Sequence, residues 1–121
     1  MPSAQRVAAC FTLTVRPEFI EEYKKRHAAV WPDMLRAIRD AGWANYTIFM
    51  RDDGTVVGYM ETDDLELAMQ RMNQSDVNSS WAAVTSHLFE EPQQWLEAVF
   101  NLDDQLRAAG LSSTIQLPKD R

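Results

Sequence analysis

Apolar and polar residues alternate strictly along the first segment with a clear pattern, residues 6–15. One side of this segment carries only apolar residues: Val7, Ala9, Phe11, Leu13 and Val15. A period of two residues is that of a β-strand with one buried face. We therefore predict a half-buried strand over residues 6–15.

From Arg16 onward the apolar residues recur at helical spacing. Proline fits the first turn of a helix, and Pro17 stands where the new pattern begins. The residues that recur every three or four positions are Ile20, Tyr23, His27, Val30 and Trp31. Pro32 disfavours helical geometry at the residue before it, so we predict a break there before the helix resumes and ends at Gly42.

Two strands joined by a tight turn come next. Residues 43–51 and 56–61 are rich in aromatic and β-branched residues, and the sequence Asp-Asp-Gly-Thr at 52–55 lies between them. Such a turn between two strand patterns predicts a β-hairpin. In a regular strand Trp43 and Tyr46 point to opposite faces of the sheet, and this is what we expect here.

A second helical region, also interrupted, follows the hairpin. Asp63 and Glu66 have the spacing of a capping box ahead of a short amphipathic helix, and Asp76 is the expected cap of a second helix. The sequence Glu-Glu-Pro at 90–92 predicts the end of this helical region. Residues 95–102 then predict a last strand.

The resulting order of elements, β-α-β-β-α-β, predicts an α+β ferredoxin-like sandwich, in which helices cover one face of a four-stranded antiparallel sheet. Because the strands carry apolar or aromatic residues on both faces, we expect the second face to line a pocket or to meet another subunit. A chain of 121 residues has the size of one domain. We assign residues 1–102 to this domain and residues 103–121 to a C-terminal extension with a short helix and a flexible tail.

The charge balance and the single cysteine narrow the classes of partner and compartment. The net charge is −6 and no stripe of lysines and arginines follows the chain, which argues against nucleic acid and anionic membranes as partners. Cys10 has no second cysteine with which to form an internal disulfide. The sequence shows neither a signal peptide nor an apolar run long enough to span a bilayer, so we expect a cytoplasmic protein.

Spaced motifs for metals, nucleotides and serine nucleophiles are absent from the sequence. Two histidines and one cysteine without HxxxH or CxxC spacing argue against a tetrahedral zinc site. Neither glycine-rich phosphate motif, GxGxxG or GxxxxGKS/T, occurs, and there is no GxSxG elbow. We therefore expect chemistry by ordinary side chains, without metal or cofactor.

Tyr23 and His27 form the most informative pair of reactive side chains. At a spacing of four residues a phenol and an imidazole lie side by side on one helix face. An imidazole with an ordinary pKa of about 6.5 can give and take a proton near neutral pH. On these residues alone a structural role for His27 is more frequent than a catalytic one. For His87, near the end of the second helical region, we expect a structural or surface role.

Aromatic side chains offer flat surfaces on which the apolar side of a sugar ring can lie. The candidates are Trp31, Trp43, Tyr46 and Trp81, and the amide of Asn45 is a candidate partner for sugar hydroxyls. For Trp31 and Trp43 a core position is the favoured interpretation. Paired carboxylates facing one another, as a glycosidase requires, are not evident.

Several motifs in a fixed order resemble one family of enzymes. Residues 22–33 read EYKKRHAAVWPD and resemble the EYxxRHxxxWPE/D signature of the L-rhamnose mutarotases. The sequence GWANY at 42–46, SDV at 75–77 ahead of Trp81, and EAVF at 97–100 follow at similar spacing. The resemblance covers about residues 6–102.

This resemblance implies a homodimer of ferredoxin-like subunits, a dimeric α+β barrel, that interconverts the α and β anomers of L-rhamnose without metal or cofactor. Position by position, His27 matches the family's proton donor, and Tyr23, Tyr46 and Trp81 match its sugar-binding residues. Ala82 departs from the pattern, because some members have a second tryptophan directly after the one that matches Trp81. The expected substrate is therefore L-rhamnose or a related 6-deoxy aldose.

The expected mechanism is general acid–base catalysis of ring opening and closing. His27 is the expected acid in ring opening and the base in the reverse step, with Tyr23 as hydrogen-bonding partner or second proton relay. The sequence does not identify the base that completes the reaction. Two alternatives share the architecture: a cofactor-free monooxygenase and a haem-binding protein with a histidine as axial ligand. A third is a non-enzymatic regulatory module that binds a sugar in the same pocket.

Overall fold

A four-stranded antiparallel sheet in the order β2-β3-β1-β4 organises residues 6–112, the part of the chain that the computed structural model describes. In chain order the elements are β1 (Val7–Val15), the 3₁₀ turn η1 (Pro17–Phe19), α1 (Ile20–Ala28), α2 (Pro32–Asp40), β2 (Ala44–Met50), β3 (Thr55–Thr62), α3 (Leu65–Asn73), α4 (Asp76–Thr85), η2 (Ser86–Leu88), β4 (Phe89–Leu96) and α5 (Leu102–Ala108). The predicted ferredoxin-like α+β order is confirmed. None of the helices in residues 6–112 is long and apolar enough to cross a bilayer.

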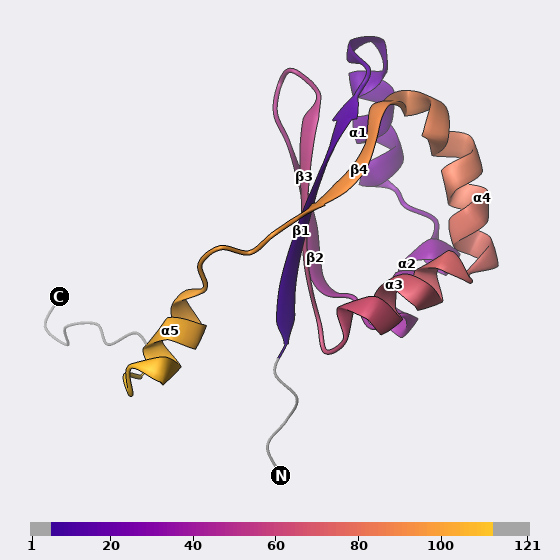
Figure 1. The fold of residues 1–121 in the computed structure, drawn as a ribbon. Helices are drawn as coiled ribbons and strands as arrows, with labels where there is room; N and C mark the ends of the chain where they lie inside the picture. Colours follow the sequence, from indigo (N-terminus) through magenta and orange to yellow (C-terminus); the bar gives the residue numbers. More distant parts are fainter. Residues whose placement is uncertain (1–5, 113–121) are drawn as a thin grey trace, which may run out of the picture.

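Four helices, α1 to α4, lie on one side of the sheet and leave its other face open (Figure 1). The core forms where the covered face of the sheet meets these helices. Its largest fully buried side chains are Phe11, Val15, Val56, Met60 and Leu88. The alternation of apolar residues predicted for the first strand therefore marks the face that packs under the helices.

Gly58 on β3 lies directly opposite Phe11 on β1. A Cβ atom at position 58 would lie 2.1 Å from Cζ of Phe11, far inside the distance at which two carbon atoms can approach. The glycine leaves room for the phenyl ring to lie flat across the middle of the sheet. Close packing at this point thus depends on the absence of a side chain at position 58.

The break predicted in the first helical region is confirmed. The helix α1 ends at Ala28, α2 begins at Pro32, and Trp31 between them has the extended backbone expected before a proline, with φ −53° and ψ 134°. Because of this break the chain turns between two helices that both lie over the same face of the sheet (Figure 1).

Both predicted helix caps are displaced by one residue. The side chain of Asp64, not Asp63, accepts a hydrogen bond from the backbone N–H of Leu67 and caps α3. The hydroxyl of Ser75, not Asp76, accepts from the N–H of Asn78 and caps α4. In both cases the capping oxygen belongs to the last residue with extended backbone, which is where an N-cap must lie.

The prediction for the last strand is wrong in its boundaries. The strand β4 runs from Phe89 to Leu96, so the sequence Glu-Glu-Pro lies inside it, and Leu102 begins the helix α5. β4 is an edge strand, and Pro92 falls where its register against β1 shifts between Thr12 and Thr14. A proline is tolerated at an irregular position on an edge because no ladder hydrogen bond is lost there.

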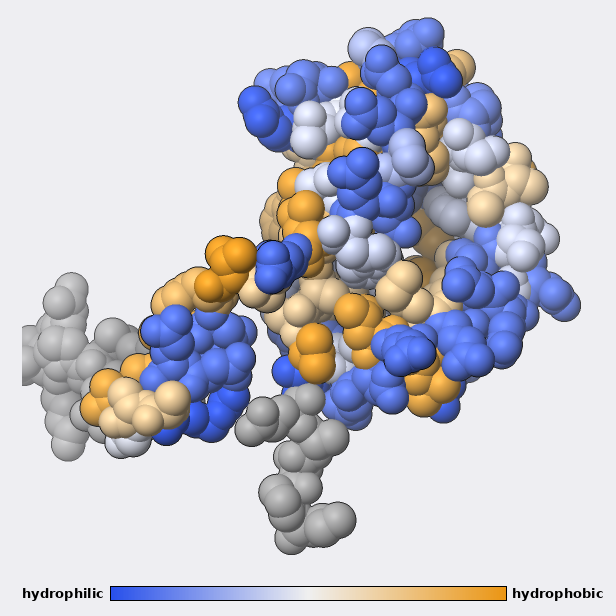
Figure 2. All heavy atoms as spheres, in the orientation of Figure 1, coloured by the Kyte–Doolittle hydropathy of each residue, from blue (hydrophilic) through white to orange (hydrophobic). Residues whose placement is uncertain are grey.

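Beyond β4 the chain leaves the body of the molecule. Residues 97–101 lead away from the sheet, and the short helix α5 lies apart from it (Figure 1). Orange apolar atoms are visible along this segment in Figure 2, and Val99 and Phe100 are largely exposed. The flexible tail predicted for the C-terminal extension falls in residues 113–121, outside the described residues.

Candidate active site

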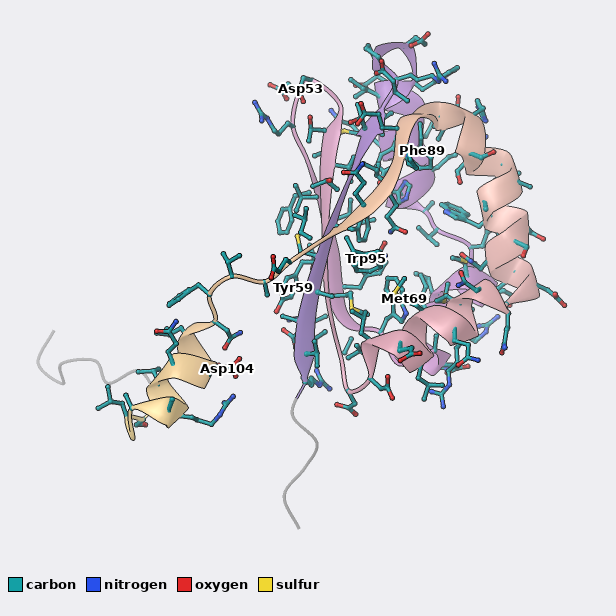
Figure 3. All side chains as sticks on the ribbon, viewed as in Figure 1. Asp53, Tyr59, Met69, Phe89, Trp95 and Asp104 are labelled. Atoms are coloured by element: carbon teal, nitrogen blue, oxygen red, sulfur yellow. The ribbon has the colours of Figure 1, made fainter. Side chains whose placement is uncertain are left out.

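A cavity of about 680 Å³ lies between the sheet and the helices. Helices α1 to α4 form one wall, and β2 and β4 form the other. Figure 3 shows Met69 of α3 and Trp95 of β4 within this space, whereas Tyr59 lies on the opposite side of the sheet. The volume and the largely apolar and aromatic lining are those of a pocket for a small organic ligand.

All four predicted site residues line this cavity, although they lie far apart in the sequence. Tyr23 and His27 come from α1, Tyr46 from β2 and Trp81 from α4. The fold therefore brings together an imidazole, two phenols and an indole at one place. Such a set can transfer protons and provide aromatic surfaces for a ring-shaped ligand.

The imidazole of His27 has a defined arrangement of protons. Its Nδ1 atom lies 2.9 Å from the backbone oxygen of Tyr23. A carbonyl oxygen can only accept a hydrogen bond, so Nδ1 carries the hydrogen and Nε2 of the neutral ring has a free lone pair. Burial lowers the pKa of His27, and the bond to Tyr23 offsets this only in part. At neutral pH the ring is therefore neutral, with Nε2 available as a base.

Two aromatic neighbours fix the plane of the His27 ring. The ring stacks on Tyr23, with centroids 4.0 Å apart and planes inclined by 26°, and meets Trp81 edge-on at 5.5 Å and 87°. Trp81 in turn meets Trp31 edge-on at 5.1 Å. Because these contacts come from two helices and the loop that joins α1 to α2, the catalytic candidate is held from several directions.

Both phenols of the cavity are kept in their protonated form. Burial raises the pKa of Tyr23 to about 12. Burial raises the pKa of Tyr46 as well, and the nearby phenol of Tyr23 adds to this shift. Each hydroxyl can therefore donate a hydrogen bond or a proton across the whole physiological pH range.

A second aromatic cluster forms the sheet side of the cavity. Tyr46 meets Trp43 edge-on with centroids 5.0 Å apart, and Trp95 lies 6.2 Å from Trp43. The indole N–H of Trp43 donates to the backbone oxygen of Ala68 at 3.2 Å. Trp31 packs against the core, as expected, whereas Trp43 has a double role because it packs against the core and also lines the cavity.

The expectation that Trp43 and Tyr46 point to opposite faces of the sheet is wrong, because both line the cavity. The expectation that the Asn45 amide meets a ligand is also wrong. Asn45 does not line the cavity, and its Nδ2 atom donates to the carboxylate of Glu61 at 3.1 Å. His87 is exposed outside the cavity, with Nε2 3.8 Å from a carboxylate oxygen of Glu22.

Sequence reasoning missed several polar residues that line the cavity: Lys24, Thr47, Asn73, Asn78 and Gln93. Nδ2 of Asn78 donates to the backbone oxygen of Met72 at 3.1 Å, whereas within residues 6–112 the side chains of Asn73 and Gln93 have no hydrogen-bond partner, so both amides are available to a ligand. The alternation of β4 places Gln93 on the same face as Trp95. With the correct start of the strand, this pattern would have found Gln93.

No group of three or more histidine, cysteine, aspartate or glutamate side chains suited to holding a metal ion occurs within residues 6–112. The polar residues that line the cavity instead carry an imidazole, phenols, carboxamides, the hydroxyl of Thr47 and the ammonium group of Lys24. These groups suit a neutral polyhydroxylated ligand, because each can donate to or accept from a hydroxyl.

Comparison with known proteins places the chain in a family. Residues 8–104 match the family model of the L-rhamnose mutarotases. The chain belongs to the L-rhamnose mutarotase family. An L-rhamnose mutarotase of Paraburkholderia xenovorans is 31% identical over 99 residues, which cover 77% of this chain and 92% of that protein. An L-rhamnose mutarotase of Oceanobacillus iheyensis is 35% identical over 72 residues, covering 59% of this chain and 68% of that one.

Solved structures show the same fold for mutarotases and for other enzymes. An L-rhamnose mutarotase of Formosa agariphila superposes with a TM-score of 0.69 at 17% identity, covering 79% of this chain and 98% of that chain. A monooxygenase of Streptomyces coelicolor in complex with nanaomycin D gives a TM-score of 0.55 at 18% identity, covering 78% of this chain and 90% of that chain. At these identities the likeness concerns the fold alone, so membership of the mutarotase family rests on the sequence match.

Proposed function

We propose that this protein interconverts the α and β anomers of L-rhamnose, or of a related 6-deoxy aldose, by acid–base catalysis of ring opening and closing. The observation that carries the proposal is the neutral His27 ring, with a free Nε2 lone pair, in a cavity that also holds two protonated phenols. Membership of the L-rhamnose mutarotase family supports the substrate class.

Ring opening requires two proton transfers. A base removes the proton from the anomeric hydroxyl, and an acid protonates the ring oxygen as the bond between that oxygen and the anomeric carbon breaks. Because His27 is neutral, we assign Nε2 of His27 to the first transfer and the hydroxyl of Tyr23 to the second. In ring closure on the other carbonyl face the protons return, so His27 acts as the acid in that step and Tyr23 as the base.

This assignment changes the order of the roles predicted from the sequence, in which His27 gives its proton first. The reason is its environment, since a half-buried imidazole without a carboxylate partner among residues 6–112 favours the uncharged form. The second group is Tyr23, for which the sequence left open a role as hydrogen-bonding partner or as proton relay. Its stacking on His27 holds both groups at one end of the cavity.

The remaining cavity walls suit a deoxy sugar. Tyr46 and Trp81 offer aromatic faces for the pyranose ring, and the amides of Asn73 and Gln93 are available to its hydroxyls. Met72, buried at the cavity wall, offers an apolar surface for the methyl group that replaces a hydroxyl in a 6-deoxy sugar.

We also propose a homodimer formed through the open face of the sheet. This face carries Phe49, which is 61% exposed, Val57 and Cys10, and Leu96 of the edge strand is 49% exposed beside Cys10. Apolar side chains on an uncovered sheet face favour burial against a copy of the same face. We further propose that the ligand is a sugar, that the protein has no nucleic-acid or membrane partner, and that it is located in the cytoplasm.

Saturation-transfer NMR over a small panel of aldoses tests the proposed function. The wild-type protein is expected to accelerate anomer exchange of L-rhamnose more than that of L-fucose or D-galactose. Binding of L-rhamnose without any acceleration would contradict the enzymatic function and support a regulatory module that binds the sugar. Acceleration of another 6-deoxy sugar above L-rhamnose would correct the substrate.

A further inference from the structure

Asn45 has an unusual backbone conformation. Its φ of 53° lies in the left-handed region, and within residues 6–112 it is the one residue other than glycine with a positive φ. Asparagine tolerates this region better than other residues with a side chain. The residue lies on β2 immediately before Tyr46, one of the proposed sugar-binding residues.

The pairing of β2 with β3 contains an extra residue at this point. Ala44 lies opposite Glu61 and Thr47 lies opposite Tyr59, so Asn45 and Tyr46 together oppose the single residue Met60. This is the arrangement of a β-bulge, in which one strand has two residues where its partner has one. Bulges redirect the chain and occur next to active sites, where they re-aim side chains.

The bulge determines which side chains face the cavity. In a regular strand Trp43 and Tyr46, three positions apart, would point to opposite faces. With the extra residue both rings lie on the cavity side, in edge-on contact with centroids 5.0 Å apart. The one extra residue therefore places both Trp43 and Tyr46 on the side of the sheet that faces the ligand.

The carboxylate of Glu61 holds Asn45 on the opposite face of the sheet. Its Oε2 atom accepts from Nδ2 of Asn45 at 3.1 Å and from the hydroxyl of Tyr59 at 2.7 Å, and Arg6 lies 3.5 Å from Oε1. The hydrogen bonds from Tyr59 and Asn45 lower the pKa of Glu61, so the acceptor is ionised at neutral pH. The amide of Asn45 is thus tied by a charge-assisted hydrogen bond to the neighbouring strand β3.

We propose that Asn45 is a positioning residue for the sugar site: its left-handed backbone, held by Glu61, places Trp43 and Tyr46 side by side on the cavity wall. The role rests on the proposed function, because its effect is on the binding of the sugar. Asn45 does not line the cavity and acts only through Tyr46 and Trp43.

The test compares Asn45→Ala with Asn45→Gly in the full chain, using saturation-transfer NMR at several concentrations of L-rhamnose to separate KM from kcat. Alanine disfavours a positive φ, whereas glycine adopts it without strain. We expect Asn45→Ala to raise KM about three- to tenfold, with a smaller change in kcat. This is the change expected when one hydrogen bond or ring contact to the sugar is lost. Asn45→Gly keeps the left-handed backbone but loses the hydrogen bond to Glu61, so its KM should lie between those of the wild type and Asn45→Ala.

A double-mutant cycle with Tyr46→Phe separates positioning from a general effect on stability. If Asn45 acts by aiming Tyr46, Asn45→Ala should raise KM much less in the Tyr46→Phe background than in the wild type. The matched control is Tyr59→Phe, which removes the other strong hydrogen bond to Glu61 and should leave KM unchanged. Should Asn45→Ala fail to fold, Glu61→Ala tests the same link, and a raised KM is again expected.

Three outcomes are decisive. If the wild type is active but folded Asn45→Ala has an unchanged KM, the positioning role alone is overturned. The same holds for an unchanged KM in Glu61→Ala, if that variant is used. An effect of the same size in the Tyr46→Phe background would also overturn it. A wild-type protein that does not accelerate exchange of L-rhamnose would overturn the proposed function, and this role with it.

Discussion

The ring of His27 is oriented by contacts that come from different parts of the chain. The backbone oxygen of Tyr23 is one helical turn away and could be anticipated from the spacing of four residues. The edge-on contact with Trp81 comes from α4, and the burial that lowers the pKa of His27 comes from the packing of separate elements around it. The pairing of Tyr23 with His27 is therefore visible in the sequence, whereas the protonation state depends on the tertiary structure.

The pH dependence of the reaction follows from the lowered pKa of His27. A neutral imidazole is the active form for proton removal, so the rate should be constant above neutral pH and fall as the pH drops through the pKa of His27. Because burial lowers this pKa below its ordinary value, the fall should begin below about pH 6.5. Exchange rates of L-rhamnose between pH 5 and pH 8 check this. A rate that falls as the pH rises through this range would show that the imidazolium acts first.

Tyr23→Phe removes the proposed acid and keeps the ring that stacks on His27. We expect kcat for anomer exchange to fall about 10²-fold or more, the range for loss of a positioned acid, while the fold is retained. Tyr59→Phe is the matched control, because Tyr59 lies on the opposite face of the sheet. A kcat equal to that of the wild type in folded Tyr23→Phe would assign the proton donation to another group.

At the scale of elements, two local irregularities explain where prediction from the sequence stops. Pro92 suggested the end of a helix, but an edge strand accepts it at a register shift. Asn45 gave no signal of a bulge, because the extra residue is defined only by the pairing with β3. The existence and order of the strands could be predicted from local patterns. The two irregularities could not, because they depend on the pairing with the neighbouring strand. The same irregularities determine that Gln93 and Trp43 face the cavity.

The close approach of Phe11 to Gly58 on the neighbouring strand should be measurable as stability. Gly58→Ala places a Cβ atom within 2.1 Å of the Phe11 ring. We expect the free energy of unfolding to fall by about 1–3 kcal/mol, the usual cost of an overpacked core. Urea denaturation provides the measurement, and Phe11→Leu, which shortens the side chain, should recover part of the loss in the double variant. An unchanged urea midpoint in Gly58→Ala would show that the strands separate without cost.

At the scale of the whole molecule, the α+β order could be predicted because most elements have a clear period and Pro32, Gly42 and Gly54 mark three of the connections between them. The cavity could not, because its walls combine side chains from six separate elements. The family motifs pointed to His27, Tyr23, Tyr46 and Trp81, which the fold brings together.

The open face of the sheet leads to a prediction about assembly. Phe49→Glu places a charge on the exposed apolar side chain of the edge strand β2 and should shift the proposed dimer toward monomer, since a charge is costly at a buried apolar interface. Sedimentation velocity at several protein concentrations measures this. Leu67→Glu on α3, also exposed but on the helical side, is the matched control and should not change the oligomeric state. A monomeric wild type would contradict the proposed dimer.

The most direct test of the account is the rate of anomer exchange of L-rhamnose with His27→Ala. Saturation-transfer NMR should show a loss of about 10²- to 10⁴-fold in the enzymatic acceleration, the contribution of a positioned acid–base group, in a variant that keeps its fold. His87→Ala, which removes the other histidine and lies outside the cavity, should exchange the anomers at the wild-type rate. A folded His27→Ala that retains the full wild-type acceleration would contradict the central claim.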